Sequence, residues 1–174
     1  MERKNAAHEL VIESMTEALM QLMRVKPLSE ISISELCEKA GVSRLSFYRN
    51  FTSMDDILVQ HLTACTDAWW AEFSQRSEED FYQNFWTELL GEYRKNRDLI
   101  LLIDQNGRSQ ILKEHIFACC AVNDAADETE AYLRAALAGT LYGLVDEWIK
   151  RGMGEFPRGF SLHKLRFDKP EAEA

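Results

Sequence analysis

Glycine and proline are scarce in this sequence, because its 174 residues include only 8 glycines and 3 prolines. Little therefore interrupts long helices. Long apolar runs are missing as well, since the longest, residues 99–103, is far shorter than the roughly 20 residues that span a bilayer. The first residues run directly into an amphipathic pattern and contain no apolar core of a signal peptide. We therefore expect a cytoplasmic protein that does not contact the membrane.

Signatures of catalysis are also missing. The sequence contains no glycine-rich loop that could cradle a phosphate, no nucleophile elbow and no carboxylate pair in a recognisable setting. Its cysteines show no C-x-x-C spacing, and in the cytosol we expect them to be reduced thiols. The sequence therefore argues against an enzyme, and we expect neither a cofactor nor a metal site. The cysteines are Cys37, Cys65, Cys119 and Cys120.

Positive charge is in deficit, with 20 basic against 29 acidic side chains and a net charge of −9. The deficit is uneven, because residues 1–54 hold seven basic and seven acidic side chains and the whole net charge lies in residues 55–174. A neutral first part and an acidic remainder are compatible with a protein in which only the first part approaches phosphates.

The sequence does contain helical periodicity. Apolar side chains recur at steps of three and four residues over 5–24, which predicts an amphipathic helix that Pro27 ends. Serine capping patterns then predict helices over 33–40, 44–51 and about 54–74. No stretch alternates with period two for long enough to form a strand, so the predicted fold is all-α with about nine helices. The remaining helices are expected near 80–95, 98–105, 110–120, 127–151 and 160–167.

Residues 31–58 are the most informative stretch. One face of the helix predicted at 33–40 is apolar, and Phe47 and Phe51 can close a small core with the neighbouring helices. This packing leaves the other side of the short helix at 44–51 open to solvent. Two short helices held in this way have the geometry of a helix-turn-helix, whose second helix enters the major groove of DNA.

Several motifs stand in this stretch in a fixed order: the Ala-Gly-Val-Ser turn at 40–43, the Phe47-Tyr48 pair, the aromatic Phe51 and the Ser-x-x-Asp cap at 53–56. In order and spacing they resemble the N-terminal pattern of the TetR family of transcriptional regulators (TetR/AcrR-like). The resemblance is strong over about residues 8–60. Beyond them it rests on the helix layout and on residues 139–148, which are similar to the long penultimate helix of many members.

The resemblance implies a fold and a function. Residues 1–54 are expected to form a helix-turn-helix DNA-binding domain, and residues 55–174 a helical domain that binds an effector and dimerises. The chain would then be a one-component DNA-binding transcriptional regulator, with repression as the expected mode. Its expected partners are a double-stranded DNA operator, a second copy of itself and a small-molecule effector whose identity the sequence does not reveal.

Individual contacts follow from the family pattern, position by position. Arg44, Leu45 and Ser46 occupy the places of base-reading side chains. Ser34 lies near the start of the supporting helix, where a further contact with DNA is usual, and Tyr48 matches a phosphate-binding tyrosine. Candidates for additional contacts with the phosphate backbone are Arg3, Lys4 and Arg49.

The sequence departs from the family pattern at three positions. Many members carry glycine in place of Leu45 and lysines in place of Thr52 and Met54. The missing lysines weaken the expected phosphate clamp at the start of the next helix. The N-terminus of that helix still offers backbone N–H groups.

The second part of the chain is expected to carry the effector pocket, because aromatic residues cluster there and would favour an apolar or aromatic ligand. Core packing is the alternative explanation for most of these rings. The candidate pocket residues are Trp69, Phe85, Trp86, Tyr93 and Tyr142.

Small residues at four-residue spacing in the predicted helix 127–151 allow another helix to approach closely, which predicts a dimer interface. Packing of the same stripe within one subunit is the alternative. The candidate interface residues are Ala135, Gly139, Gly143 and Trp148.

Two alternatives concern partners and ligands. The acidic second part and the missing lysines leave open a TetR-like interaction module that acts through a protein partner rather than by reading an operator. Histidine and cysteine also stand one helical turn apart at His61/Cys65 and His115/Cys119. If the two helices adjoin, four zinc-type ligands could converge. Buried histidines and buried, inert thiols are the alternative interpretation.

Overall fold

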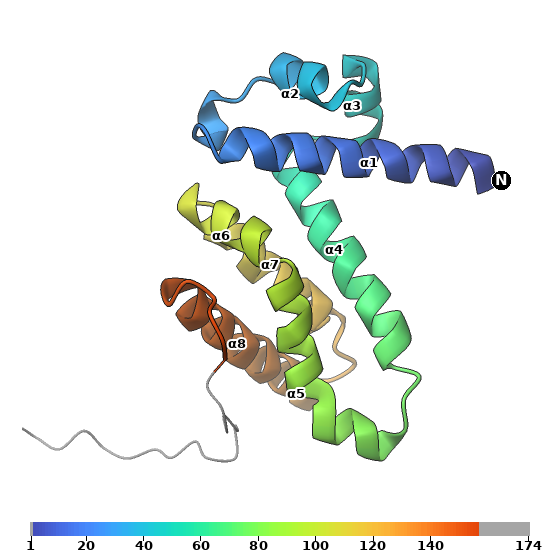
Figure 1. The fold of residues 1–174 in the computed structure, drawn as a ribbon. Coiled ribbons are helices and arrows are strands. Elements are labelled where there is room, and N and C mark those ends of the chain that lie inside the picture. Colours follow the sequence, from blue (N-terminus) through green and yellow to red (C-terminus); the bar gives the residue numbers. More distant parts are fainter. Residues whose placement is uncertain (1, 157–174) are drawn as a thin grey trace, which may run out of the picture.

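The computed structural model describes residues 2–156, and within them the side chains of residues 9–80 and 84–156 (Figure 1). The α-helices are α1 (Glu2–Met23), α2 (Ile33–Ala40), α3 (Arg44–Asn50), α4 (Met54–Phe73), α5 (Glu78–Lys95), α6 (Arg97–Gln105), α7 (Ser109–Cys119) and α8 (Glu128–Lys150). Two short 3-10 helices, η1 (Leu28–Glu30) and η2 (Val122–Asp124), complete the elements of this range. Residues 2–156 contain no strand, and the predicted all-α fold is confirmed. The helix expected at 160–167 lies outside the described residues.

Side-chain caps fix where the short helices begin. The hydroxyl oxygens of Ser32, Ser43 and Ser53 each accept a hydrogen bond from the backbone N–H three residues further on, at 3.2, 3.1 and 3.0 Å. Each such cap stabilises its helix by roughly 1 kcal/mol. Gly41 ends α2 with φ +68°, a left-handed conformation that glycine adopts without strain. The predicted caps of α2, α3 and α4 are therefore confirmed.

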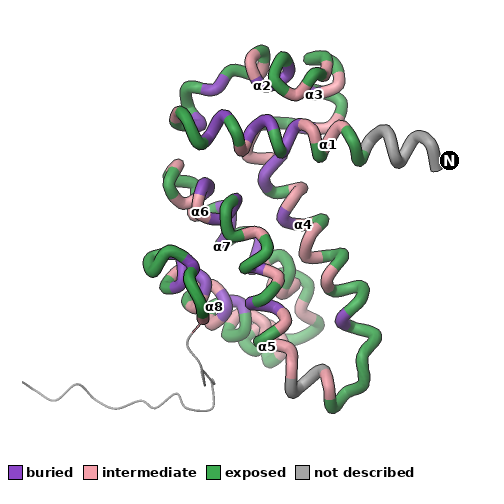
Figure 2. Tube along the Cα trace, viewed as in Figure 1, coloured by how far each residue is buried: buried purple, intermediate pink, exposed green. Residues whose placement is uncertain are grey.

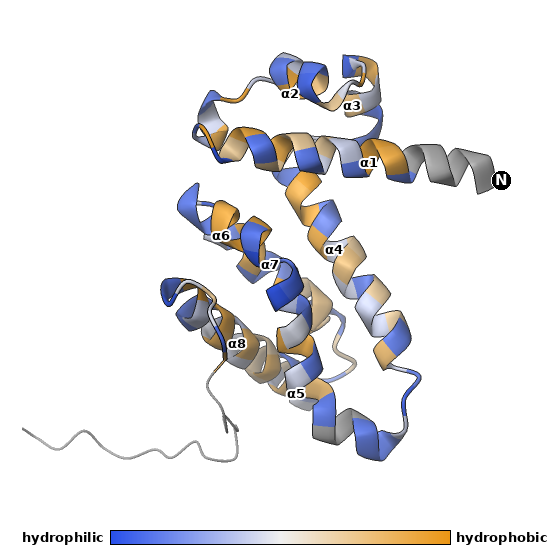
Figure 3. Cartoon of the chain, viewed as in Figure 1, coloured by the Kyte–Doolittle hydropathy of each residue, from blue (hydrophilic) through white to orange (hydrophobic). Residues whose placement is uncertain are grey.

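We call α1–α3 and the first two turns of α4 the head. In it α1 crosses above α4 and packs against both α2 and α4 (Figure 1). The upper turns of α4, coloured as hydrophobic in Figure 3, lie where this helix meets α1. Their side chains Ile57 and Leu58 are fully buried together with Leu19, Leu36 and Phe47. One apolar core therefore fixes the orientation of α3.

The body consists of the rest of α4 and of α5–α8. α7 packs against both α4 and α8, and buried residues occur along α4 and α8 (Figure 2). Leu112 and Ile116 of α7 and Val145 of α8 are almost fully buried in this core. Within the part of the chain that the structure describes, no helix is long and apolar enough to cross a membrane.

Head and body are joined by α4 and by polar contacts at the far end of α6. The backbone N–H of Leu28 donates to Oδ1 of Asn106 at 2.7 Å. Arg108 lies 3.5 Å from the carboxylate of Asp55 at the start of α4. The predicted boundary between residues 54 and 55 falls inside the first turn of α4, which continues from the head into the body without a linker. That boundary stays a prediction.

Candidate nucleic-acid interface and body cavity

The helix α3 is held from one side by aromatic packing. Phe47 is completely buried, and its ring lies 5.3 Å from that of Tyr48 in an edge-to-face arrangement and 5.9 Å from that of Phe51. The Ser43 cap fixes the first turn, where the hydroxyls of Ser43 and Ser46 also lie 3.0 Å apart. The inner face of α3 is thus immobilised, which positions its outer face.

The outer face of α3 is open. Leu45 is 58% exposed and Tyr48 64% exposed, and Arg44 and Arg49 are exposed as well. Arg44 and Tyr48 are four residues apart, so they lie on the same side of the helix. A cation, an apolar side chain and a phenol therefore share one solvent-facing surface.

Other predicted contact residues occupy different surroundings. Ser34 is exposed in the first turn of α2, next to α3. Ser46 is half-buried, because its N–H and its hydroxyl both face Ser43. The side chains of Arg3 and Lys4 lie outside those that the structure describes.

The start of α4 carries two acids, Asp55 and Asp56, next to the positions where the family pattern has lysines. The carboxylate of Asp56 accepts from the backbone N–H of Thr52 at 2.7 Å and from its hydroxyl at 3.1 Å. The N–H of Asp56 is itself capped by Ser53. The chain's own side chains therefore satisfy part of this helix end, which supplies no cation for a phosphate.

Comparison with known proteins agrees with this geometry. Residues 16–60 match the family model of bacterial regulatory proteins, tetR family. No curated protein matches the chain. The matched residues span the second half of α1, the helix-turn-helix and the beginning of α4, which together form the head. Residues 16–60 therefore form an N-terminal domain of the tetR family type, which supports a DNA-binding transcriptional regulator, and the resemblance found in this part of the sequence is confirmed.

The body contains a cavity of about 540 Å³. We call it the body cavity. Side chains from α4, α5, α7 and α8 surround it, together with Cys120, which follows α7 directly. Its lining residues are Thr66, Asp67, Trp69, Trp70, Phe85, Trp86, Leu89, Tyr93, Cys119, Cys120, Arg134, Leu137 and Leu141. This volume lies within the range of small-molecule sites in proteins.

The structure brings together four of the five predicted pocket residues, namely Trp69, Phe85, Trp86 and Tyr93. Tyr142 is not part of this lining and packs half-buried against the core instead. On α8 the face formed by Arg134, Leu137 and Leu141 borders the cavity, and Tyr142 lies about 100° further round the helix. Sequence reasoning missed the contributions of α7 and α8, because they depend on how the helices pack.

The aromatic side chains that line the cavity also pack on one another. Trp69 stacks on Phe73 at 5.0 Å between ring centroids, and Phe85 meets Trp86 edge-to-face at 5.4 Å. Phe73 belongs to the interior, since it is almost fully buried and does not line the cavity. The rings of Trp69, Phe85 and Trp86 both pack against other rings and line the cavity.

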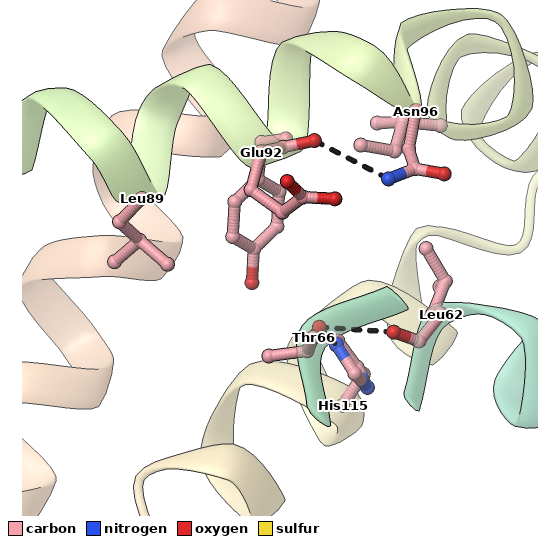
Figure 4. A pocket seen from close by; sticks show the side chains of 8 residues that line it. Leu62, Thr66, Leu89, Glu92, Asn96 and His115 are labelled. Carbon is pink, nitrogen blue, oxygen red and sulfur yellow. Dashed lines mark hydrogen bonds between the residues drawn. The ribbon is translucent and has the colours of Figure 1, made fainter. Parts of the chain in front are cut away.

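A much smaller cavity of about 10 Å³ adjoins the first (Figure 4). Thr66 donates to the carbonyl of Leu62 at 2.9 Å and lies 3.0 Å from Nε2 of His115. On the opposite wall, Asn96 donates to the backbone carbonyl of Glu92 at 3.2 Å. The space is about large enough for one water molecule and is too small for an organic ligand.

The two His–Cys pairs remain separate pairs. Sγ of Cys65 lies 3.7 Å from His61, and Sγ of Cys119 lies 3.5 Å from His115. Among the described residues no three or more His, Cys, Asp or Glu side chains gather as they would around a metal ion. The convergence of four ligands is therefore not found. Burial raises the pKa of Cys119 to about 11, so this thiol lacks the thiolate character of a redox sensor.

The outward face of α8 is partly apolar. Tyr132 and Leu133 are 70% and 67% exposed, and Gly139 and Gly143 are exposed further along the helix. A Cβ atom added at either glycine would meet nothing within 4 Å. Packing within the subunit therefore does not require glycine at these positions, although glycine within a helix costs about 0.5–1 kcal/mol relative to alanine.

Trp148 does not belong to that face. It is only 5% exposed, its indole N–H donates to the carbonyl of Gly154 at 2.9 Å, and its ring meets Phe156 edge-to-face at 5.2 Å. The chain folds back after α8 and covers this side of the helix. Trp148 thus packs within the subunit, which leaves little of its side chain for contact with a second copy. Ala135 is half-buried.

Proposed function

We propose that the chain acts as a homodimeric one-component repressor. Its head reads an operator in double-stranded DNA, and a small molecule in the body cavity changes its affinity for that operator. The observation that carries the proposal is the arrangement of α3, whose inner face is anchored by Phe47 while Arg44, Leu45 and Tyr48 face solvent. A helix anchored and exposed in this way fits the major groove.

The three exposed side chains suit different tasks in a groove. The guanidinium of Arg44 can bond O6 and N7 of guanine as a fork, a contact that contributes about 1–3 kcal/mol of discrimination. Leu45 can pack against the methyl group of thymine. The hydroxyl of Tyr48 can donate to a phosphate, which positions the helix without reading a base.

The remaining candidates add affinity rather than sequence selectivity. Arg49 at the end of α3 and Ser34 at the start of α2 are exposed on the two elements of the motif. Together with the predicted Arg3 and Lys4 they would contact the phosphate backbone. Each phosphate that is neutralised makes binding weaken more steeply as salt increases.

A selection from random duplex DNA at about physiological salt tests the DNA-binding role. Wild type should enrich a two-fold symmetric site. Arg44→Ala should lose discrimination at one guanine of each half-site, whereas Tyr48→Ala should weaken binding evenly across sequences. Arg94→Ala is the matched control, because Arg94 is an exposed arginine on α5, outside the helix-turn-helix.

The result that would contradict operator reading is no enrichment by the wild type over a range of salt concentrations. That result would favour the alternative, in which the fold acts through a protein partner. Equal loss of selectivity in Arg44→Ala and Arg94→Ala would show that α3 is not the reading helix.

The proposed dimer uses the outward face of α8 against the same face of a second copy. Tyr132, Ala136, Gly139 and Gly143 follow one another at steps of three or four residues and are all exposed. The two glycines are unexplained within the subunit, and close approach of a second helix would explain them. Dimers of helix-turn-helix proteins read half-sites about one helical turn of DNA apart.

The proposed effector response depends on α4. Near its start Ile57 and Leu58 belong to the core of the head, and near its end Trp69 and Trp70 line the body cavity. A ligand that binds one orientation of α4 more tightly than another would therefore shift the position of α3. The size of the response is limited by the difference between those two affinities.

A further inference from the structure

The wall of the body cavity offers ring faces to a ligand. The rings belong to Trp69, Trp70, Phe85, Trp86 and Tyr93. They come from two helices, α4 and α5, so they border the cavity from more than one side. The face of an aromatic ring carries negative charge density and attracts cations, most strongly in tryptophan.

Two charged side chains line the same cavity, and only one of them is balanced. Arg134 donates from Nε and Nη2 to Oε1 of Glu130 at 3.0 and 2.6 Å and from Nη1 to the carbonyl of Ala121 at 2.7 Å. Its charge is therefore compensated from within α8. Asp67 has no hydrogen bond or ion pair with any of the described residues. Its carboxylate thus leaves the lining with an unbalanced negative charge.

Neighbouring titratable groups do not supply the missing positive charge. His115, whose Nε2 lies close to Thr66, is buried, and burial lowers its pKa below the usual value, so it is neutral at neutral pH. The high pKa of Cys119 keeps this thiol uncharged. Burial also raises the pKa of Tyr93 and keeps its phenol neutral.

We infer that the effector is an organic cation with apolar or aromatic substituents, whose charge is held between the ring faces and the carboxylate of Asp67. The inference rests on the proposed effector role of the body cavity and adds the chemical class of the ligand. A neutral molecule of the same shape fills the same apolar space but leaves Asp67 unbalanced. Because Asp67 is partly exposed to solvent, its contribution to affinity is moderate.

A pair of probes that differ only in charge tests this inference. Phenyltrimethylammonium and tert-butylbenzene have nearly the same shape, but only the first is a cation. Binding is followed by tryptophan fluorescence, because three of the four tryptophans line the cavity and the fourth, Trp148, lies elsewhere. Wild type should bind the ammonium ion roughly three- to tenfold more tightly than the hydrocarbon, as expected for one partly exposed carboxylate with ring faces.

Asp67→Asn should remove most of this preference and leave the affinity for tert-butylbenzene unchanged. Glu72→Gln is the matched control, because it removes one exposed carboxylate from α4 outside the cavity lining and should keep the preference. Both positions are exposed, so both variants should fold, which circular dichroism checks.

Three results would overturn the inference. If tert-butylbenzene binds as tightly as the ammonium ion and also weakens operator binding, the cavity is an effector site for neutral ligands. If Asp67→Asn and Glu72→Gln change the affinity for the cation equally, only the general charge of the body matters. If neither probe binds, the proposed effector role of the body cavity is refuted, and the inference of a cationic effector is refuted with it.

Discussion

The hydrogen bond between Leu28 and Asn106 should be a measurable connection between head and body. Oδ1 of Asn106 accepts from the backbone N–H of Leu28 at 2.7 Å, and Nδ2 donates to the carbonyl of Leu102 at 2.8 Å. Asn106→Ala removes both bonds and leaves a part-buried N–H without its acceptor. An unsatisfied buried donor costs about 1–3 kcal/mol. We expect the free energy of unfolding to fall by about that amount.

Urea denaturation followed by circular dichroism measures this change. Asn106→Asp is the matched control, because it keeps an oxygen acceptor for Leu28 and loses only the donor to Leu102. It should therefore recover part of the lost stability. Asn106→Ala should also reduce the effect of an effector on operator binding. The operator affinities of the effector-bound and the effector-free protein should differ less in this variant than in wild type. A free energy of unfolding within about 0.5 kcal/mol of wild type would refute the reasoning.

Three further predictions concern the recognition helix, the dimer and the pH dependence. Replacing a thymidine of the selected operator by deoxyuridine removes only the methyl group. At one position of each half-site this change should weaken binding by wild type but not by Leu45→Ala. An equal loss of affinity in both proteins would exclude a contact between Leu45 and a thymine methyl group. Gly143→Leu should lower the dimer fraction in analytical ultracentrifugation, whereas Gly91→Leu, at an equally open helical glycine, should not. Burial lowers the pKa of His115 in the folded state below its value in the unfolded chain, which is about 6.5. The free energy of unfolding should therefore be highest above that pH and should decrease as the pH falls below it. In thermal unfolding, the melting temperature of His115→Gln should depend less on pH than that of wild type. An unchanged pH dependence would show that His115 does not cause the decrease.

Local signals made much of the fold predictable. Serine caps act over three residues, so the starts of α2, α3 and α4 follow from Ser32, Ser43 and Ser53. Apolar periodicity predicted a helix at 127–151, where the structure has Glu128–Lys150. The head was predictable in more detail than the body, because its motif lies within one continuous stretch.

The composition of the cavity was less predictable, since it depends on contacts between distant segments. Trp69 and Phe85 were expected from their aromatic character alone. Asp67 and Arg134 carry no local signal, and they line the same cavity only because α7 packs against both α4 and α8. The buried position of Trp148 likewise depends on the reversal after α8, where Gly154 reaches its indole N–H.

The continuity of α4 has a mechanical consequence. Its 20 residues form a rod of about 30 Å with the cavity near one end and the head at the other. A tilt of about 10° around the cavity end would displace the head by about 5 Å, more than the 3.4 Å between successive base pairs. In a symmetric pair both rods would tilt in opposite directions, so the displacement would double. Rearrangement of a few side chains around a ligand would then suffice to move two recognition helices out of register with DNA.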